Sequence, residues 1–199
     1  MNFKILSSET LSKVYKFSMR MITFSHDRYD GSNTGEYGRV VFDRGDSVCI
    51  LLYDRADQTF IMTEQFRIGV AVNPGGDSPW VLETVAGSMD GGPGETPLDT
   101  AMREVEEEAP GCKVLHVMPM PSFYNSPGGS SEKTHMFCAV IDSSGVAENG
   151  GLAEHNEDIK VVKIPVQQAY RDLDEGRINT SSAMIAIMWF RLNERSMDV

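Results

Sequence analysis

The feature that most constrains this chain is residues 86–111, which read AGSMDGGPGETPLDTAMREVEEEAPG. Glycine adopts positive φ angles and lets a ligand approach the backbone, so residues 87–94 are predicted to form a loop. Thr96 is a good N-cap, Pro97 suits the first helical position, and Pro110-Gly111 ends a helix. The segment therefore predicts a glycine-rich loop that leads directly into a helix.

The predicted helix has an apolar side and an acidic side. Its apolar residues recur at helical spacing and are expected to pack inward: Leu98, Met102, Val105 and Ala109. Glu104, Glu107 and Glu108 gather on another side, where like charges cost a helix about 0.2–0.5 kcal/mol per pair. One interpretation is a solvated acidic face. The other is a bound hard divalent cation such as Mg²⁺, with Arg103 bracing one carboxylate.

The same segment resembles the signature of a known family. Gly87, Glu95 and the run REVEEE at residues 103–108 are similar to the Nudix box, which has a glycine, then a glutamate, then R-E-U-x-E-E-x-G-U with U apolar. The chain departs from this box in two places. Extra residues near Gly91-Gly92 are expected to change the path of the loop. Pro110-Gly111 stands where glycine and an apolar residue are usual, which is expected to alter only the end of the helix.

Composition and charge narrow the class of protein. A chain of 199 residues, 41% hydrophobic and 24% charged, is long enough for one substantial globular domain. The net charge of −11 argues against a nucleic-acid backbone or an anionic membrane as partner. The three cysteines form no CxxC pair, and no apolar run resembles a signal peptide or a membrane span. We therefore expect a cytoplasmic protein.

The rest of the chain predicts strands and helices that support this segment. Strands are expected at residues 14–24, 36–43, 47–53, 59–64, 80–85, 113–118, 134–141 and 159–164, and helices at 166–175 and 181–193. Loops are expected at residues 69–78, 123–132 and 142–158. This pattern indicates an α/β (α+β) fold with a mixed sheet flanked by helices. The first strand is expected to be an exposed edge, a reasonable place for subunit contact.

The resemblance extends to the ADP-ribose pyrophosphatase branch of the Nudix hydrolases. Further matching segments are FDRG at residues 42–45, EQFR at 64–67, PWVLE at 79–83, SPGG at 126–129, EDI at 157–159, QAY at 168–170 and GRI at 176–178. The resemblance implies a three-layer α/β/α sandwich for residues 46–199. It also implies an N-terminal antiparallel β-sheet for residues 1–45, which serves dimerisation and substrate contact. Enzymes of this branch use Mg²⁺ (or Mn²⁺) to split ADP-ribose into AMP and ribose 5-phosphate, commonly as homodimers.

Roles carry over from the family by position. The implied metal ligands are the carbonyl of Ala86 and the carboxylates of Glu104, Glu107, Glu108 and Glu157. The implied catalytic residues are Glu107, Glu108, His155 and Glu157. The implied substrate-binding residues are Arg39 on the adenine side, Arg67 at the diphosphate, the carboxylates of Glu83 and Glu132, and Gly128 and Gly129. Metal-bound carboxylates suit this chemistry, because diphosphate hydrolysis needs charge neutralisation and an activated water.

Several alternatives stay open. Val40 stands where an acidic residue is expected beside the adenine-contacting arginine, so GDP-mannose or another nucleotide sugar such as ADP-glucose is a rival substrate. A Nudix protein that senses a nucleotide without cleaving it is a further alternative, although the intact acidic set argues against it. Arg67 could form only a surface salt bridge, and residues 126–129 could be only a turn. His155, where a glutamate base is expected, could be a surface residue without a role.

Overall fold

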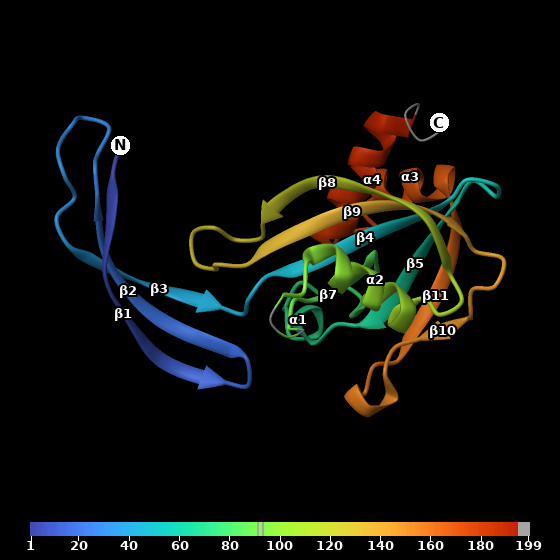
Figure 1. Cartoon of the computed structure of the whole chain (residues 1–199), viewed down its shortest axis with the longest axis horizontal. Coiled ribbons are helices and arrows are strands. Elements are labelled where there is room, and N and C mark those ends of the chain that lie inside the picture. The colour runs from blue at the N-terminus through green and yellow to red at the C-terminus, as the bar shows by residue number, and fades with distance from the viewer. Residues whose placement is uncertain (91, 93, 195–199) are drawn as a thin grey trace. The chain divides into compact units, whose positions relative to one another are not determined.

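In a computed structural model of the chain, which describes residues 1–90, 92 and 94–194, the structure divides into two units (Figure 1). Unit 1 comprises Met1–Asp46 and Phe123–Lys133. Unit 2 comprises Ser47–Ser122 and Thr134–Val199. Gly91, where the glycine loop departs from the Nudix box, lies outside the described residues.

Unit 1 is built on an antiparallel sheet in the order β1-β2-β3. Its strands are β1 (Phe3–Val14), β2 (Phe17–His26) and β3 (Tyr37–Asp43). The strand expected at residues 14–24 corresponds to β2, but β2 is the central strand, so its expected position at an exposed edge is wrong. β1 was not predicted, because its sequence FKILSSETLSKV is mostly polar and its residues are exposed. The loop 123–133 joins this unit through Phe42, whose N–H donates to the carbonyl of Gly129 at 2.8 Å.

Unit 2 contains a sheet of eight strands in the order β10-β11-β5-β4-β9-β8, with β6 paired to β5 and β7 paired to β4. The strands are β4 (Ser47–Asp54), β5 (Thr59–Phe66), β6 (Trp80–Glu83), β7 (Val85–Ser88), β8 (Lys113–Tyr124), β9 (Lys133–Asp142), β10 (Asn149–Gly150) and β11 (Ile159–Pro165). β4 runs parallel to β9 and antiparallel to β5 and β7, so the sheet is mixed as predicted.

Two strands differ from their predicted ranges for identifiable reasons. The strand expected at residues 80–85 is interrupted at Thr84, because the chain stops pairing with β5 and begins to pair with β4. β8 continues past the expected end at residue 118, through Pro119 and Pro121. Proline is tolerated there because β8 lies at the end of the strand order, where one side of the strand needs no ladder donors.

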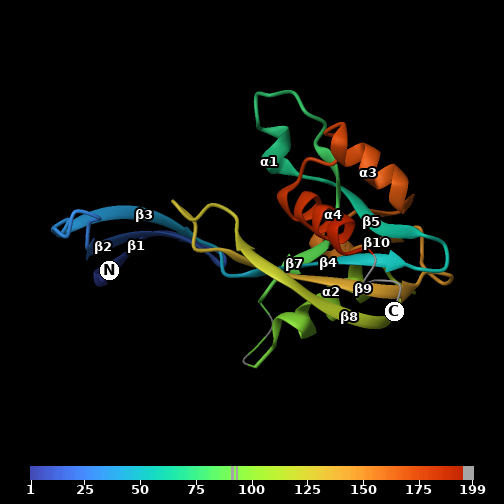
Figure 2. The same cartoon turned by 90° about the horizontal axis from the view of Figure 1, so that it is seen from above.

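The helices cover both faces of the unit 2 sheet. They are α1 (Ile68–Ala71), α2 (Pro97–Glu108), the 3₁₀ turn η1 (Ala153–His155), α3 (Val166–Asp174) and α4 (Ser181–Asn193). In Figure 2, α3 and α4 lie on one side of the sheet and α2 on the other, which confirms the three-layer arrangement. The short helix α1 occupies part of the loop expected at residues 69–78. None of the helices in the described ranges is long and apolar enough to cross a bilayer.

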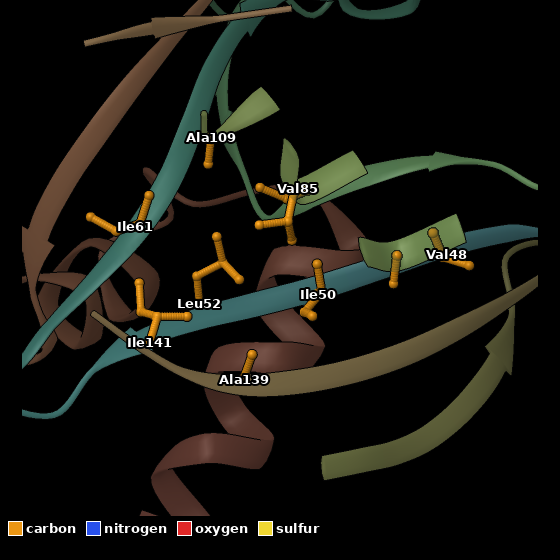
Figure 3. Close-up of a cluster of buried hydrophobic side chains, with 10 residues drawn as sticks. Val48, Ile50, Leu52, Ile61, Val85, Ala109, Ala139 and Ile141 are labelled. Carbon is orange, nitrogen blue, oxygen red and sulfur yellow. The ribbon is translucent and has the colours of Figure 1, made fainter. Parts of the chain in front are cut away.

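β4 is the strand on which both helical layers depend. Val48, Ile50 and Leu52 lie in one buried cluster with Ala109 (Figure 3), and Val105 of α2 belongs to the same cluster. The opposite face carries Tyr53, whose ring lies 4.6 Å from that of Phe190 on α4. The two faces are apolar because both are covered, which explains the continuous apolar run in the sequence.

α2 begins as predicted and buries Val105 as expected, but one of its expected inward residues is exposed. Thr96 and Asp99 form a capping box, with the Asp99 N–H donating to the Thr96 hydroxyl and the Thr96 N–H donating to the Asp99 carboxylate. Leu98, expected to pack inward, is 41% exposed, so that expectation is wrong. Instead Glu104 and Glu108 are buried beside Val105. The acidic side of α2 therefore faces the protein rather than solvent.

Candidate active site

The centre of the candidate site is the contact between α2 and β7. β7 pairs with β4, which places Ala86 opposite Cys49 and Gly87 opposite Val48. The Ala86 N–H donates to Oε2 of Glu108 at 3.2 Å. A Cβ at Gly87 would lie 1.9 Å from Oε1 of Glu104, so only glycine allows the carboxylate this close to the strand. The glycine of the box is therefore required by a close approach.

The two buried carboxylates lack full compensation for the charge they would carry. Glu104 is 8% exposed and Glu108 is 5% exposed. Burial raises the pKa of Glu108 to about 8; the Ala86 N–H and Arg67 oppose the rise, while the charges of Glu104 and Glu157 add to it. Burial also raises the pKa of Glu104 to about 7; Arg103 opposes the rise, while Glu107 and Glu157 add to it. A bound proton or a neighbouring cation would therefore stabilise both carboxylates.

Arg103 supplies part of the missing positive charge. Its guanidinium lies 2.8 Å from Glu104 and 3.1 Å from Glu107, which confirms that it braces the acidic cluster. Longer ion pairs reach Glu95 at 3.6 Å and Asp90 at 3.8 Å. The Arg103 guanidinium thus links α2 to the loop that precedes it.

Arg67 and Glu83 form a second ion pair near the buried carboxylates. Arg67 follows β5 and Glu83 ends β6, and the Arg67 Nε donates to the Glu83 Oε2 at 2.6 Å. The Arg67 charge lowers the pKa of Glu108, which places the guanidinium within electrostatic reach of that carboxylate. The Arg67 side chain remains 42% exposed, so it can bind an anion while it stays paired.

Glu157 reaches the site from the loop between β9 and β11. Its carboxylate accepts a hydrogen bond from the Leu152 N–H at 3.1 Å. Its charge raises the pKa of both Glu104 and Glu108, so a carboxylate from a distant part of the chain lies within electrostatic reach of α2. His155 lies at the end of η1 in the same loop and is exposed. Gly150 and Gly151 hold this loop against α2. The sequence pattern did not predict a role for them.

Comparison with known proteins assigns the chain to a family. The NUDIX domain matches residues 43–184, which is well over half of the chain. The chain belongs to the Nudix family. An ADP-ribose pyrophosphatase from Haemophilus influenzae is 38% identical over 193 residues, 96% of this chain and 87% of that protein. A GDP-mannose pyrophosphatase from Pectobacterium atrosepticum is 38% identical over 149 residues, 75% of this chain and 74% of that protein.

A solved structure shares the fold of this Nudix chain. A crystal structure titled as an ADP compounds hydrolase aligns with a TM-score of 0.72 and covers 99% of this chain and 96% of that one. At 19% identity this likeness concerns the fold alone. The predictions of a Nudix hydrolase and of a mixed α/β architecture are both confirmed.

The remaining substrate-binding residues predicted from the Nudix resemblance lie in unit 1. Arg39 lies over the ring of Tyr37, with its Cζ 5.0 Å from the centroid. Glu132 is buried and forms an ion pair with Arg44 at 3.6 Å. Gly128 and Gly129 lie in the loop 123–133, where an added Cβ would meet nothing within 4 Å. The roles of these residues toward a substrate stay predictions.

The carboxylates of the Nudix box fit a hard divalent cation by their chemistry. Glu104, Glu107 and Glu108 offer carboxylate oxygens, and their mutual repulsion and burial favour added positive charge. Among the described residues no group of three acidic, histidine or cysteine side chains already converges as a ligand set. The Arg103 guanidinium instead lies on Glu104 and Glu107.

The burial of Glu104 and Glu108 predicts an unusual dependence of stability on pH. Between the ordinary glutamate value of 4.5 and the raised pKa values of about 7 and about 8, the folded chain binds more protons than the unfolded chain. The free energy of unfolding of the metal-free protein should therefore fall as pH rises, by on the order of 5 kcal/mol between about pH 5.5 and pH 8.5. Urea unfolding in excess chelator measures it.

The matched control for this prediction is Glu106, the exposed neighbour on the same helix. The variants Glu104→Gln and Glu108→Gln should flatten the pH dependence, whereas Glu106→Gln should leave it unchanged. An equal slope in all of these proteins would show that the two buried carboxylates do not cause it.

Proposed function

We propose that the chain hydrolyses the diphosphate bond of ADP-ribose, giving AMP and ribose 5-phosphate, with Mg²⁺ as the cation and Mn²⁺ as a substitute. The observation that carries the chemistry is the pair of buried carboxylates, Glu104 and Glu108, within electrostatic reach of Arg67. A site of this kind holds a cation on one side and an anionic phosphate on the other. The substrate rests on the similarity to the Haemophilus influenzae ADP-ribose pyrophosphatase over nearly the whole chain.

In unit 2, different residues would bind the cation and the phosphate. Glu104 and Glu108 would be the principal ligands of the cation, with additional oxygens from Glu107, Glu157 and the Ala86 carbonyl. The cation supplies Lewis acidity and lowers the pKa of a coordinated water. Arg67 binds a phosphate oxygen and neutralises charge that develops as the bond breaks. Glu83 holds Arg67 in place through the 2.6 Å hydrogen bond, which limits the rotamers of the guanidinium.

The Nudix resemblance supports the proposal that four residues of unit 1 contact the substrate: Arg39, Glu132, Gly128 and Gly129. The Arg39 guanidinium lies over the ring of Tyr37. A planar base could stack on the opposite face of the guanidinium. Glu132 is a buried carboxylate suited to accept hydrogen bonds from sugar hydroxyls. An added Cβ at Gly128 or Gly129 would meet nothing within 4 Å, so the backbone there is open to a close approach.

The second candidate is hydrolysis of GDP-mannose or another nucleotide sugar such as ADP-glucose. Two observations favour it: the similarity to the Pectobacterium atrosepticum GDP-mannose pyrophosphatase, and Val40 beside Arg39, where no acidic side chain is available to read the base. A sensor that binds without cleaving is disfavoured, because Glu104 and Glu108 are retained in buried positions. Each would be costly to bury as a charge without a bound cation.

We place the protein in the cytoplasm, with a small nucleoside diphosphate derivative rather than a nucleic acid or a membrane as its partner. Cys49, Cys112 and Cys138 are all free thiols, which suits a reducing compartment. A net charge of −11 opposes binding to polyanions.

Removal of one buried carboxylate tests the proposed function directly. Purified protein should hydrolyse ADP-ribose only with a divalent cation. Glu108→Gln should lower kcat by roughly 100-fold or more, because a lost ligand weakens the cation site. Glu106→Gln, on the exposed side of the same helix, should retain activity. Hydrolysis in excess chelator, or full activity of Glu108→Gln, would refute the assignment.

The same assay distinguishes the substrates. A panel of ADP-ribose, ADP-glucose and GDP-mannose, with products identified by chromatography, should give the largest kcat/KM for ADP-ribose. A larger value for GDP-mannose would favour the second candidate. Binding of a nucleotide with no turnover of any compound in Mg²⁺ or Mn²⁺ would indicate a sensor.

We propose that residues 1–45 form a dimerisation subdomain and that the functional unit is a homodimer. Phe3 and Ile5 of β1 lie opposite His26 and Phe24, on one face of the unit 1 sheet, and they are 75% and 53% exposed. Exposed apolar side chains grouped on one face mark an interaction surface. The double variant Phe3→Ser, Ile5→Ser should sediment as a monomer and bind ADP-ribose more weakly, whereas Tyr29→Ser, in a turn outside the sheet, should remain a dimer. A fully active monomeric wild type would rule the dimer out.

We propose His155 as the general base, and a pH profile tests it. A histidine base loses activity when it is protonated, so kcat/KM of the wild type should decline on the acidic side. His155→Ala should lose roughly 100-fold or more in kcat and change the shape of that acidic limb. Glu154→Gln is the matched control on the same 3₁₀ turn. An unchanged rate and profile in His155→Ala would leave Glu154, Glu157 or the cation-bound water as the base.

A further inference from the structure

The loop that carries Glu157 is attached directly to the end of α2. The Gly151 N–H donates to the carbonyl of Glu107 at 2.7 Å. The Ala147 N–H donates to the carbonyl of Pro110 at 2.9 Å. Carbonyls at a helix end lack intrahelical donors, and the loop supplies them. The last turn of α2, which carries Glu107 and Glu108, is therefore joined to residues 147–151 by the backbone itself.

Gly150 lies in β10 directly against the backbone of α2, where no larger residue would fit. It pairs with Ile159 across β10 and β11, so its position in the sheet is fixed. A Cβ at Gly150 would lie 2.2 Å from the carbonyl oxygen of Glu108 and 2.9 Å from its Cα. These atoms belong to the backbone of α2 and cannot move aside as a flexible side chain would. Any side chain at residue 150 must therefore separate the loop from α2.

Gly151 makes the corresponding close approach to Glu157. Its φ of +88° lies in the region that favours glycine. A Cβ there would lie 2.9 Å from the carbonyl oxygen and 3.0 Å from the Cβ of Glu157. Leu152, the next residue, donates its N–H to the Glu157 carboxylate at 3.1 Å and accepts from the Glu157 N–H at 3.2 Å. The carboxylate is thus held by backbone that starts at Gly151.

We propose that Gly150 and Gly151 are positioning residues, which set the distance between the Glu157 carboxylate and the carboxylates of α2. Gly150 fixes the loop against the backbone of Glu108, and Gly151 fixes Glu157 against the loop. The cation ligands from α2 and from the loop are then placed by a continuous set of backbone contacts. This inference rests on the proposed function, in which Glu157 and Glu108 share one cation.

The proposal predicts a specific defect when either glycine is replaced. Gly150→Ala and Gly151→Ala should weaken Mn²⁺ binding, followed by the paramagnetic resonance signal of free Mn²⁺, by about 10-fold. With saturating cation, kcat for ADP-ribose should fall about 10- to 100-fold while KM changes little, because a displaced ligand acts on the chemical step. Gly151→Asn should show the same defect, since asparagine tolerates a positive φ but retains the Cβ that meets Glu157.

Gly176 provides the matched control. It has a φ of +76° and an added Cβ would meet nothing within 4 Å, so Gly176→Ala introduces backbone strain without displacing Glu157. It should lower the melting temperature of the metal-free protein but leave Mn²⁺ affinity unchanged. Equal Mn²⁺ affinity in Gly150→Ala, Gly151→Asn and the wild type would overturn the proposal.

A double-mutant cycle separates positioning from general destabilisation. In a Glu157→Gln background, Gly150→Ala should cause little further loss of Mn²⁺ affinity or kcat, because the group it positions is already gone. Full additivity of the two losses would overturn the proposal. The Mn²⁺ measurements also keep the two hypotheses apart. A wild type that binds Mn²⁺ but does not hydrolyse ADP-ribose would refute the proposed function, whereas the variants would still decide the role of the glycines.

Discussion

The burial of two like-charged carboxylates on one helix is the constraint around which unit 2 is built. Glu104 and Glu108 lie against β7, where desolvation disfavours their charged forms. Arg103 and the Ala86 N–H offset only part of that cost. The burial of these two carboxylates lowers the free energy of unfolding of the domain, a cost that is common at functional sites. The pKa values are raised because positive charge is lacking beside these carboxylates, and a divalent cation would supply it.

The apolar core makes this burial possible. β4 is covered on both faces, so it fixes β7 by pairing and α2 by packing. The helix cannot rotate to expose Glu104 and Glu108 without removing Val105 and Ala109 from the core, at a cost of about 25 cal/mol per Å² of apolar surface exposed. Packing of the apolar side of α2 thus keeps its acidic side buried, although burial disfavours the charged carboxylates.

Local signals in the sequence were sufficient for much of the fold. The capping box at Thr96 and Asp99, the covered strands β4, β5 and β9, and helix α4 all follow from residue type and spacing. The polar strand β1 was missed because its order depends on pairing with β2 rather than on its own apolar pattern. The break at Thr84 was missed because both halves of that stretch have strand-like sequence, and only the choice of partner separates them.

The sequence by itself determined the family and the identity of the acidic residues, because the Nudix box is a contiguous pattern on one loop and one helix. Tertiary structure decided that the acidic side of that helix is not a solvated face, because Glu104 and Glu108 are buried against β7, whereas Leu98 is exposed. It also decided that the loop of Glu157 lies against α2, since the 2.7 Å hydrogen bond from the Gly151 N–H to the Glu107 carbonyl links segments that are far apart in the chain. Spacing along a chain specifies local geometry, whereas the distance between two segments depends on the packing of everything between them.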